Sequence, residues 1–388
     1  MSVIVATKEE VQEYYLSEAL GQSKLKRLLG DISSFQKEED SSAEHFVIGS
    51  AVDCLLTSTP EDFEQSYHIS KVEKLPSDAV IKILGHVYED LLSDYAEHLE
   101  VVTGQENPAP VTSFFEFVGE LNTWETYILD ACLKEDWNRN WGAAAKLKNI
   151  LEPGAEYFKE LCLAKGKRIL STDQASTVDN IVAFLKSNPR TSRYFDRDNF
   201  MQLPHVTIHY QFAMYFEYRG VQCKALLDMV VVERDADGRI VSITPIDLKT
   251  MNGNTFYFPS SVRARRYDIQ AAWYTLALHH HFAIPEGSDI IKPFLFVVES
   301  TSYQGKPLVF QADSTLLQIG RYGRKAISLV DTNLFTQDAQ NAVLAWEIKG
   351  FEQLLDLYLY HIENGFREER EVQEAGLTPL VINWDGII

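Results

Sequence analysis

Clustered cysteines, long apolar runs and an excess of basic residues are all lacking in this chain of 388 residues. The cysteines are scattered and form no CxxC pair, which argues against a zinc ribbon or an iron–sulfur cluster and favours reduced, mostly buried thiols. They are Cys54, Cys132, Cys162 and Cys223. No run approaches the roughly 18 apolar residues of a membrane helix, and the start of the chain lacks a signal-peptide pattern. We therefore expect a cytoplasmic protein, bacterial or in an infected host cell, with no membrane partner.

The shortage of basic residues is uneven along the chain. The formal net charge of −20 argues on its face against a nucleic-acid partner. Residues 201–300, however, hold 9 Lys and Arg against 10 Asp and Glu, so this stretch carries only −1. It also contains a tight arginine group, Arg263, Arg265 and Arg266. Because an acidic protein can still present a basic groove, DNA binding is not excluded.

Local sequence patterns predict the following order of elements along the chain: helices, three strands, a helix, a strand and further helices. Residues 207–250 are rich in β-branched and aromatic residues, and turn signals at 219–220 and 237–238 divide them into an antiparallel meander. A helix is expected over 259–282, a strand over 292–300, and helices over 314–330 and 339–365. This order predicts an α/β (α+β) fold with a mixed central sheet flanked by helices.

The second turn of the meander predicts a pair of facing carboxylates. If Asp237-Gly238 is a two-residue hairpin loop, paired residues have numbers that sum to 475. Asp228 then faces Asp247, with Cβ atoms about 4.5–5.5 Å apart. Lys249 lies two residues beyond Asp247 and shares its face of the sheet.

The first turn adds a third strand to this face. If Arg219-Gly220 is also a two-residue loop, paired residues sum to 439 and Gln211 falls opposite Asp228. One face of the meander would then present Gln211 beside the two carboxylates and the lysine, provided that no β-bulge shifts the register.

Facing carboxylates in apolar strands need compensating cations. Lys249 supplies one positive charge against two negative ones, and a divalent metal would supply the rest. Mg²⁺ suits one or two carboxylates with phosphate oxygens, and it can activate water for phosphodiester chemistry. Lys249 would then position or deprotonate the attacking water. The alternative is a buried Asp228–Lys249 salt bridge, with Asp247 peripheral.

The helix expected over 259–282 carries a polar face next to this cluster. Arg263, Tyr267, Gln270 and Tyr274 stand at i, i+4, i+7 and i+11. Such a face suits contacts with a phosphate, a base edge or a catalytic water. The alternative is a solvated arginine face, with Tyr267 and Trp273 packed into the core.

These residues resemble the PD-(D/E)XK nuclease superfamily. The segment CKALLDMVVV…ITPIDLKT is similar to its D…(D/E)XK signature, and RRYDIQAAWY resembles the YxxQ helix of its lambda-exonuclease and RecE-like (exonuclease VIII) branches. Upstream, GQSKLKRLL and HFVIGSAVDCLLTSTPEDF resemble two further RecE-like motifs. The resemblance runs from about residue 20 to about residue 300, in four ordered motifs.

The resemblance implies a restriction-endonuclease-like core and assigns roles to residues. It implies one nuclease domain over 1–388, with a helical N-terminal part at about 1–200, an insertion lobe as an option at 76–165, a catalytic core at about 201–300 and a helical C-terminal part at 301–388. The implied metal ligands are Asp53, Asp228, Asp247 and the Leu248 carbonyl. The implied catalytic residues are Asp228, Asp247, Lys249, Gln270 and Tyr267. Candidate substrate contacts are Arg263, Arg265, Arg266, Gln211 and His45.

Asp53 departs from the family pattern, because relatives place a metal-binding histidine there. A carboxylate can replace imidazole around a hard cation, and His45 is the fallback on the same helical face. An ordinary exposed helix residue is the alternative reading of Asp53.

The activity implied is Mg²⁺-dependent exonuclease digestion of linear double-stranded DNA from its ends, with Mn²⁺ as a substitute and 5′-to-3′ polarity. It would leave single strands for recombination or repair, with a single-strand annealing protein as a partner and a homo-oligomeric ring as an assembly. The alternatives are an endonuclease or Cas4-like end-trimming nuclease, a catalytically silent DNA-binding protein on the same fold, and an enzyme of unrelated chemistry.

Overall fold

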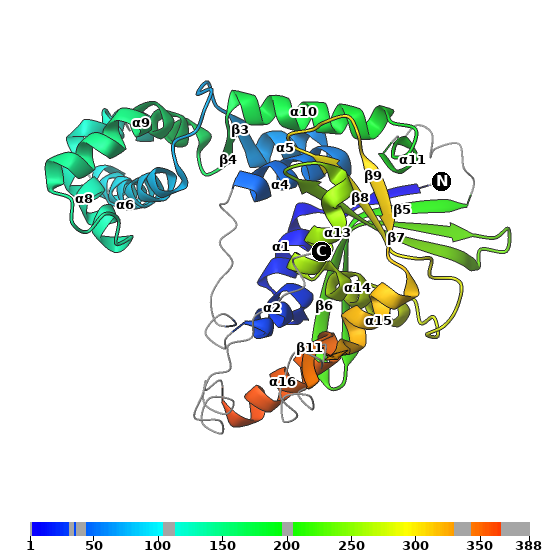
Figure 1. Cartoon of the computed structure of the whole chain (residues 1–388). Coiled ribbons are helices and arrows are strands. Elements are labelled where there is room, and N and C mark those ends of the chain that lie inside the picture. The colour runs from blue at the N-terminus through cyan, green and yellow to red at the C-terminus, as the bar shows by residue number, and fades with distance from the viewer. Residues whose placement is uncertain are drawn as a thin grey trace.

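The structure, a computed structural model, describes residues 2–30, 35, 44–103, 113–195, 205–329 and 343–365. Its centre is a seven-stranded mixed sheet with helices on both faces (Figure 1). The path is β1-β5-β6-β7-β8-β9, and β2 pairs with β6 beside it. The strands are β1 (Ser2–Val5), β2 (Leu20–Gly21), β5 (Val206–Tyr218), β6 (Val221–Arg234), β7 (Ile240–Met251), β8 (Leu295–Ser300) and β9 (Leu308–Gln311). The predicted fold class, a mixed sheet flanked by helices, is confirmed.

The hairpin between β5 and β6 turns as predicted. Tyr218 pairs with Val221, so Arg219 and Gly220 form a two-residue loop, and pairs along the ladder sum to 439. Both loop residues have positive φ, 52° and 76°, as a type I′ turn requires. A type I′ turn matches the twist of the flanking strands, which is why this short loop sets the register.

The hairpin between β6 and β7 reaches the predicted register by a different route. The amide of Asp235 donates to the Arg239 carbonyl at 2.9 Å, and Gly238 has φ +81°, so the loop has three residues rather than two. A bulge next to Glu233 then restores the predicted sum of 475. The predicted loop was wrong, and the predicted register holds because the bulge compensates for the extra residue.

The pair Gln211 and Asp228 interrupts the ladder between β5 and β6. Tyr210 pairs with Met229 and Phe212 pairs with Leu227, whereas Gln211 has φ +52° and no ladder partner. On β6, odd-numbered residues before Asp228 pack in one core (Cys223, Ala225, Leu227), and those after it pack in the other (Met229, Val231). At Asp228, therefore, the odd-numbered side chains of β6 change from one face of the sheet to the other. The continuous polar face expected across β5, β6 and β7 is interrupted at this point.

The sheet also forks at this level. The ladder between β6 and β7 ends at Met229 and Ile246. Beyond it, β7 continues beside β8 to the pair Met251 and Ser300, while β6 pairs with β2 at Cys223. Asp228 and the C-terminal half of β7 therefore stand where the two strands part.

Two hydrophobic cores lie on the two faces of the sheet. One contains α14 with α2 and α16, and the other contains α4 and α10. The helices around the sheet are α1 (Lys8–Leu16), α2 (Gln22–Lys26), η1 (Arg27–Leu29), α4 (Glu44–Thr57), α5 (Pro60–Ser66), α10 (Thr172–Ser187), α11 (Ser192–Phe195), η3 (Thr255–Tyr257), α13 (Phe258–Arg265), α14 (Tyr267–His281), α15 (Ser314–Tyr322) and α16 (Phe351–Asn364).

A third hydrophobic core holds together a helical lobe beside the sheet (Figure 1). The lobe consists of α6 (Asp78–Thr103), α7 (Phe114–Val118), η2 (Leu121–Trp124), α8 (Glu125–Lys134) and α9 (Ala143–Ala164). Two short parallel strands, β3 (Tyr67–Ile69) and β4 (Arg168–Leu170), flank it in sequence. These bounds lie close to the insertion lobe expected at 76–165, and the division of the chain into domains stays a prediction.

Three helical predictions were wrong in part. The N-terminal part also contains β1 to β4. The expected helix over 259–282 breaks at Arg266, whose φ of +52° ends α13 before α14 begins. In the C-terminal part, two antiparallel strands, β10 (Arg324–Leu329) and β11 (Val343–Ile348), occupy positions where helix was expected. Gly323, with φ +71°, ends α15 and lies so close to Gly350 that neither could carry a Cβ without a backbone shift.

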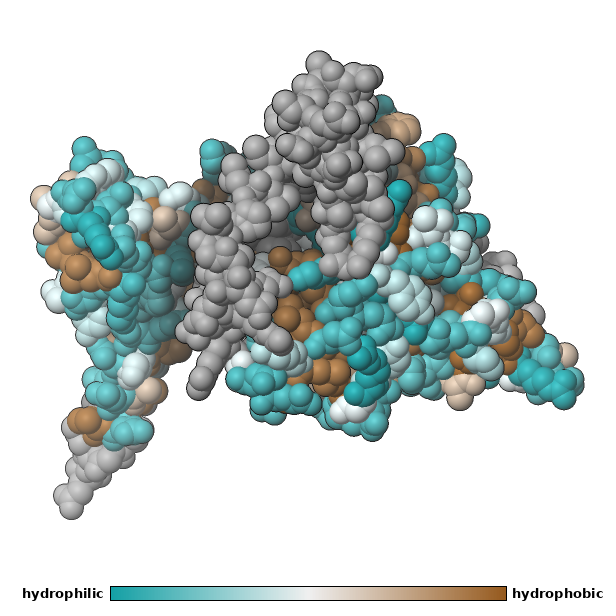
Figure 2. All heavy atoms as spheres, turned by 60° about the horizontal axis from the view of Figure 1, so that its bottom comes forward, coloured by the Kyte–Doolittle hydropathy of each residue, from teal (hydrophilic) through white to brown (hydrophobic). Residues whose placement is uncertain are grey.

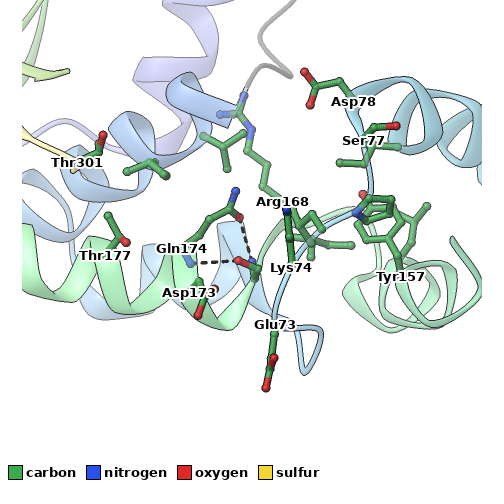
Figure 3. Close-up of a pocket in the computed structure, with 18 of the residues that line it drawn as sticks. Glu73, Lys74, Ser77, Asp78, Tyr157, Arg168, Asp173, Gln174, Thr177 and Thr301 are labelled. Atoms are coloured by element: carbon green, nitrogen blue, oxygen red, sulfur yellow. Dashed lines mark hydrogen bonds between the residues drawn. The ribbon is translucent and has the colours of Figure 1, made fainter. Parts of the chain in front are cut away.

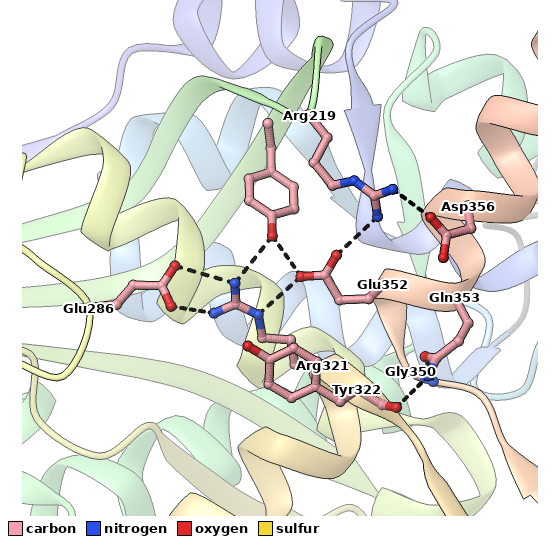
Figure 4. Close-up of polar contacts among 9 residues, drawn as sticks. Arg219, Glu286, Arg321, Tyr322, Gly350, Glu352, Gln353 and Asp356 are labelled. Atoms are coloured by element: carbon pink, nitrogen blue, oxygen red, sulfur yellow. Dashed lines mark hydrogen bonds and ion pairs between the residues drawn. The ribbon is translucent and has the colours of Figure 1, made fainter.

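A charged network attaches α15 and α16 to the β5–β6 hairpin (Figure 4). Arg321 pairs with Glu286 at 2.5 Å and with Glu352 at 3.1 Å, and it donates to the Tyr218 hydroxyl at 3.1 Å. Arg219, in the hairpin turn, pairs with Glu352 at 3.2 Å. The network thus joins three elements that are distant in sequence.

None of the described helices is both long and apolar enough to cross a membrane. Within the described residues all four cysteines are free thiols, with Cys54 partly buried and the other three buried, as predicted. Among the coloured residues in Figure 2, most of the visible surface is hydrophilic, and the apolar side chains lie in groups between the hydrophilic ones.

Candidate active site

Asp228 occupies the fork between β6 and β7. Its Oδ2 accepts a hydrogen bond of 2.7 Å from the backbone amide of Leu248. The backbone ladder between β6 and β7 ends at the neighbouring pair, Met229 and Ile246. Beyond that pair, the Asp228 side chain lies between the two strands and takes the place of a backbone hydrogen bond. Since the N–H and C=O of one strand residue point to the same edge, the Leu248 carbonyl also faces the β6 side, where it was predicted to contribute.

Asp247 is held from two sides. It is 1% exposed, its Oδ1 accepts from the Gln270 side-chain amide at 2.8 Å, and its Oδ2 lies 2.5 Å from the Lys249 ammonium. That ammonium lies 4.9 Å from the centre of the Tyr267 ring, a cation–π contact. The structure therefore brings four of the predicted catalytic residues, Asp247, Lys249, Tyr267 and Gln270, into one group. The alternative prediction, a salt bridge between Asp228 and Lys249, was wrong in its partner. Lys249 pairs with Asp247 instead.

Asp53 reaches the site from α4 on the opposite face of the sheet. Its Oδ2 accepts from the Gln211 amide at 2.6 Å, and Thr57, one turn later, donates to its backbone carbonyl at 2.7 Å. Gln211 also lies 3.3 Å from the Thr57 hydroxyl. The left-handed backbone of Gln211 is costly for a residue with a side chain, and here it accompanies an amide directed at Asp53. Asp53 is thus not an ordinary exposed helix residue.

Close packing of α4 on β7 sets the position of Asp53. Gly49 stands one turn before Asp53 on the same helical face. A Cβ at Gly49 would lie 2.9 Å from the Thr250 hydroxyl oxygen. Only glycine lets the helix approach β7 this closely without a shift.

Electrostatics link the carboxylates. Burial raises the pKa of Asp53 to about 7, and the charge of Asp247 adds to the rise. Hydrogen bonds from Thr57 and Gln211 and the charge of Lys249 oppose it. Metal-free Asp53 therefore titrates near neutral pH.

Asp228 and Asp247 show the same trend. Burial, followed by the charges of Asp247 and Asp53, raises the pKa of Asp228 well above its usual value. Burial also raises the pKa of Asp247, against the nearby Lys249. For Lys249, burial lowers the pKa, but the charges of Asp247 and Asp228 more than offset this and raise it. Lys249 is therefore a stable cation among carboxylates that repel one another.

The three arginines of the predicted group have different surroundings. Arg266 pairs with Asp268 at 2.9 Å and donates to the Lys349 carbonyl at 2.7 Å, so its guanidinium is used inside the protein. Arg263 and Arg265 are exposed on α13. The break at Arg266 puts Arg263 on a different helix from Tyr267 and Gln270, so the continuous polar face that we expected does not form. The His45 side chain lies outside the described part of the structure.

Sequence reasoning assigned no role to Lys26 on α2. Its ammonium lies 5.9 Å from the centre of the Tyr267 ring and 3.3 Å from the Arg265 carbonyl, and its charge lowers the pKa of Asp247. The motif GQSKLKRLL contains this lysine, but it stands 221 positions before Asp247 in the sequence. Thr57 was also missed, although its place one turn after Asp53 was visible.

The donors at this site suit a hard divalent cation. Asp53, Asp228, Asp247 and the Leu248 carbonyl offer only oxygen. Fully ionised, the three carboxyl groups would carry three negative charges against the single charge of Lys249, and their raised pKa values reflect the cost of ionising them in this buried site. In the described part of the chain, however, no three Asp, Glu, His or Cys side chains are already arranged as a metal site. Each carboxylate is instead turned toward a protein donor, so a metal would have to exchange with these contacts.

Comparison with known proteins is limited to distant likenesses. No protein-family model matches the chain, and no curated protein matches it either. A candidate exonuclease from Eubacterium rectale is 14% identical with a TM-score of 0.36, covering 81% of this chain and 80% of its own. The protein SSO0001 is 13% identical with a TM-score of 0.19, covering 60% of this chain and 82% of its own. Likenesses this distant establish neither a shared family nor a shared activity.

Proposed function

We propose that this protein is a Mg²⁺-dependent DNA nuclease of the PD-(D/E)XK type. The observation that carries the proposal is the group of three carboxylates with raised pKa values at the fork of the sheet, with Lys249 in contact with one of them. Structural salt bridges usually balance charge, whereas this group, once ionised, has more carboxylates than cations, and a divalent cation would neutralise the excess. The order of the four sequence motifs supports the same function.

Each residue of the site has a separate proposed role. Asp53, Asp228, Asp247 and the Leu248 carbonyl would hold Mg²⁺ or, as a substitute, Mn²⁺. The bound ion would orient the phosphodiester and lower the pKa of a water. Lys249, fixed by Asp247 and the Tyr267 ring, provides a cation beside the reacting phosphate and a donor for the attacking water. Gln270 fixes the rotamer of Asp247.

We further propose a cytoplasmic exonuclease that digests linear double-stranded DNA from its ends, 5′ to 3′, and leaves single strands for recombination or repair. This part rests on the likeness of the motifs to lambda-exonuclease and RecE-like proteins. The same likeness suggests an annealing protein as a partner and a homo-oligomeric ring as the assembly. A monomeric mass in solution would reject the ring.

A second candidate is a catalytically silent DNA-binding protein on the same fold. The contact between Asp247 and Lys249 favours it, because a carboxylate already paired at 2.5 Å is less available to a metal. Cleavage and binding must therefore be measured on the same preparations.

The test compares linear and closed circular duplex DNA, with Mg²⁺, Mn²⁺ or EDTA. The variants are Lys249→Ala and, as the matched control, Lys148→Ala, which removes a lysine that is 69% exposed on the lobe. Metal-dependent loss of the linear form alone, abolished only by Lys249→Ala, is expected. Cleavage of circles would indicate an endonuclease. Binding without cleavage under either metal would reject the nuclease and support the silent binding protein.

A further inference from the structure

Three large aromatic side chains are strongly exposed on two loops that follow β7 and β8. Phe256 is 72% exposed, Tyr257 is 69% exposed and Tyr303 is 64% exposed. Aromatic rings contribute most to stability when they are buried, so three on neighbouring loops suit a contact surface better than a packing role. Phe256 and Tyr257 belong to η3, and Tyr303 follows β8.

Hydrogen bonds join the two loops. The Gly253 amide donates to the Ser302 hydroxyl at 2.9 Å, and that hydroxyl donates to the Asn252 side chain at 2.6 Å. Further along, the Thr255 hydroxyl donates to the Lys306 carbonyl at 3.1 Å. Each exposed ring therefore stands within two residues of a bond between the loops.

A buried carboxylate anchors the loop that carries Tyr303. Glu299 is 0% exposed at the end of β8, and its Oε1 accepts from the Ser300 amide at 2.8 Å. The nearby backbone amides of Gly305 and Lys306 lower the pKa of this carboxyl, although burial raises it overall. The Ser300 hydroxyl accepts hydrogen bonds from the Ser302 and Tyr303 amides at 3.2 and 2.8 Å. The loop backbone is thus held in place while the Tyr303 ring is exposed, as a rigid stacking surface requires.

This aromatic rim directly follows the candidate active site in the chain. Lys249 is followed by Thr250, Met251 and Asn252, which lead into the first loop. The same three residues, with Thr301 of the second loop, line a cleft of about 1370 Å³ between the core and the helical lobe. That volume exceeds the roughly 300–1,000 Å³ of clefts for small ligands, so it suits a polymer.

The walls of the cleft mix apolar side chains with polar and charged ones, and the cationic side chains among them are suited to contacts with phosphate. Figure 3 shows Thr177 and Thr301 on the core side, Ser77, Asp78 and Tyr157 on the lobe side, and Lys74 and Arg168 between them. Lys74 and Arg168 are both exposed. With Lys167 they balance Glu73, Asp78 and Asp173, so the lining is neutral in a chain of net charge −20. An anionic strand meets less repulsion here than over the molecule as a whole.

We infer that the aromatic rim (Phe256, Tyr257 and Tyr303) and the cleft beside it bind an unpaired DNA strand next to the cleavage site. The rings stack on bases, and Lys74 and Arg168 contact phosphates as the strand continues under the lobe. The inference rests on the proposed nuclease function and names the form of its substrate: the end of the strand is held single-stranded where it meets the active site.

Binding is tested without cleavage, in EDTA, with a short fluorescent single-stranded oligonucleotide and a blunt duplex of equal length. The triple variant Phe256→Ala, Tyr257→Ala and Tyr303→Ala should bind the single strand at least fivefold more weakly, since loss of stacking on even one base weakens binding by about that factor. The matched control is Tyr215→Ala, which removes a 45% exposed ring from β5 and should bind normally.

The cleft is tested by salt dependence. Each phosphate contact contributes about 0.7 to the slope of log K against log salt for a single strand. The double variant Lys74→Ala and Arg168→Ala should therefore lower this slope by about 1.4. Lys148→Ala serves as the charge control.

The proposal is overturned if single-strand affinity survives the triple variant, if Tyr215→Ala loses as much, or if the salt slope does not change in the Lys74 and Arg168 variant. Cleavage of linear duplex by the unmodified protein is measured alongside. If the triple aromatic variant loses single-strand binding but the unmodified protein does not cleave, the nuclease function is rejected and the strand-binding surface is supported. Cleavage with aromatic-independent binding would reject the surface alone.

Discussion

Replacing Asp53 by asparagine should stabilise the metal-free protein at neutral and higher pH. The folded-state pKa of Asp53 is about 7, against an ordinary value of 3.8. A difference of about three units corresponds to about 4 kcal/mol of unfavourable free energy for the ionised group. This is an upper limit, because the carboxylates are coupled and asparagine keeps only part of the hydrogen bonding with Gln211 and Thr57. We expect a gain of about 1–4 kcal/mol in the free energy of unfolding.

The sign of the pH dependence follows from the direction of the shift. Because the folded-state pKa is raised, the folded protein binds the proton more tightly than the unfolded chain. The penalty is absent below about pH 4 and complete above about pH 7. The stability advantage of Asp53→Asn should therefore be near zero at about pH 4 and grow as the pH rises through 7.

The assay is urea unfolding in EDTA at several pH values, followed by tryptophan fluorescence. Asp62→Asn is the matched control, because hydrogen bonds from Thr59 lower the pKa of Asp62. That substitution should reduce stability at neutral pH, and the difference should vanish in acid. A metal-free Asp53→Asn protein no more stable than the unmodified one at about pH 8 would refute the account of repelling carboxylates. Added Mg²⁺ should raise the melting temperature of the unmodified protein more than that of the variant.

Three further predictions concern helix packing, the charged network around Arg321 and backbone geometry. Gly49→Ala places a Cβ 2.9 Å from the Thr250 hydroxyl and should cost about 1–3 kcal/mol of stability together with most of the nuclease activity. The control is Gly85→Ala, where a Cβ meets nothing within 4 Å; it should stabilise α6 by about 0.5–1 kcal/mol. Equal melting temperatures for Gly49→Ala and Gly85→Ala would contradict the packing argument. Arg321→Ala should lower the free energy of urea unfolding by about 2 kcal/mol, below the roughly 3–5 kcal/mol of a fully buried pair because one partner carboxylate is half exposed; no change would mean that the network is dispensable. Gln211→Gly should lose activity yet be about 1 kcal/mol more stable in thermal unfolding than Gln211→Ala, since glycine tolerates the positive φ, and the reverse order would remove the strain argument.

Turn chemistry made the central part of the site predictable. Arg219-Gly220 and the Gly238 turn limit the register of β5, β6 and β7, and this register puts Asp228 and Asp247 one residue beyond the last shared pair, Met229 and Ile246. The β6–β7 register survived a wrong loop only because a bulge compensated, which the sequence does not reveal. The fold class could be predicted because few architectures place a segment of alternating apolar and polar residues between helical segments.

Other features depend on tertiary contacts that a single sequence does not show. Positive φ at Gln211 and Arg266 is uncommon for these residue types, so neither the interrupted ladder nor the broken helix was predicted. Short strands such as β1 and β10 carry too few residues for a clear period. Lys26 reaches the site through the packing of α2 on α14, which no local pattern specifies. Whether the assigned residues act in catalysis stays a prediction.

The fork in the sheet makes its shape sensitive to the charge of the site. Past Met229 and Ile246, the bond between Asp228 and the Leu248 amide joins two strands that no longer share a ladder. Repulsion among the carboxylates acts to widen this gap, and any cation that neutralises them acts to close it. The Leu248 amide lies in this gap, so the exchange rate of its proton would report on how firmly the two strands are held together there.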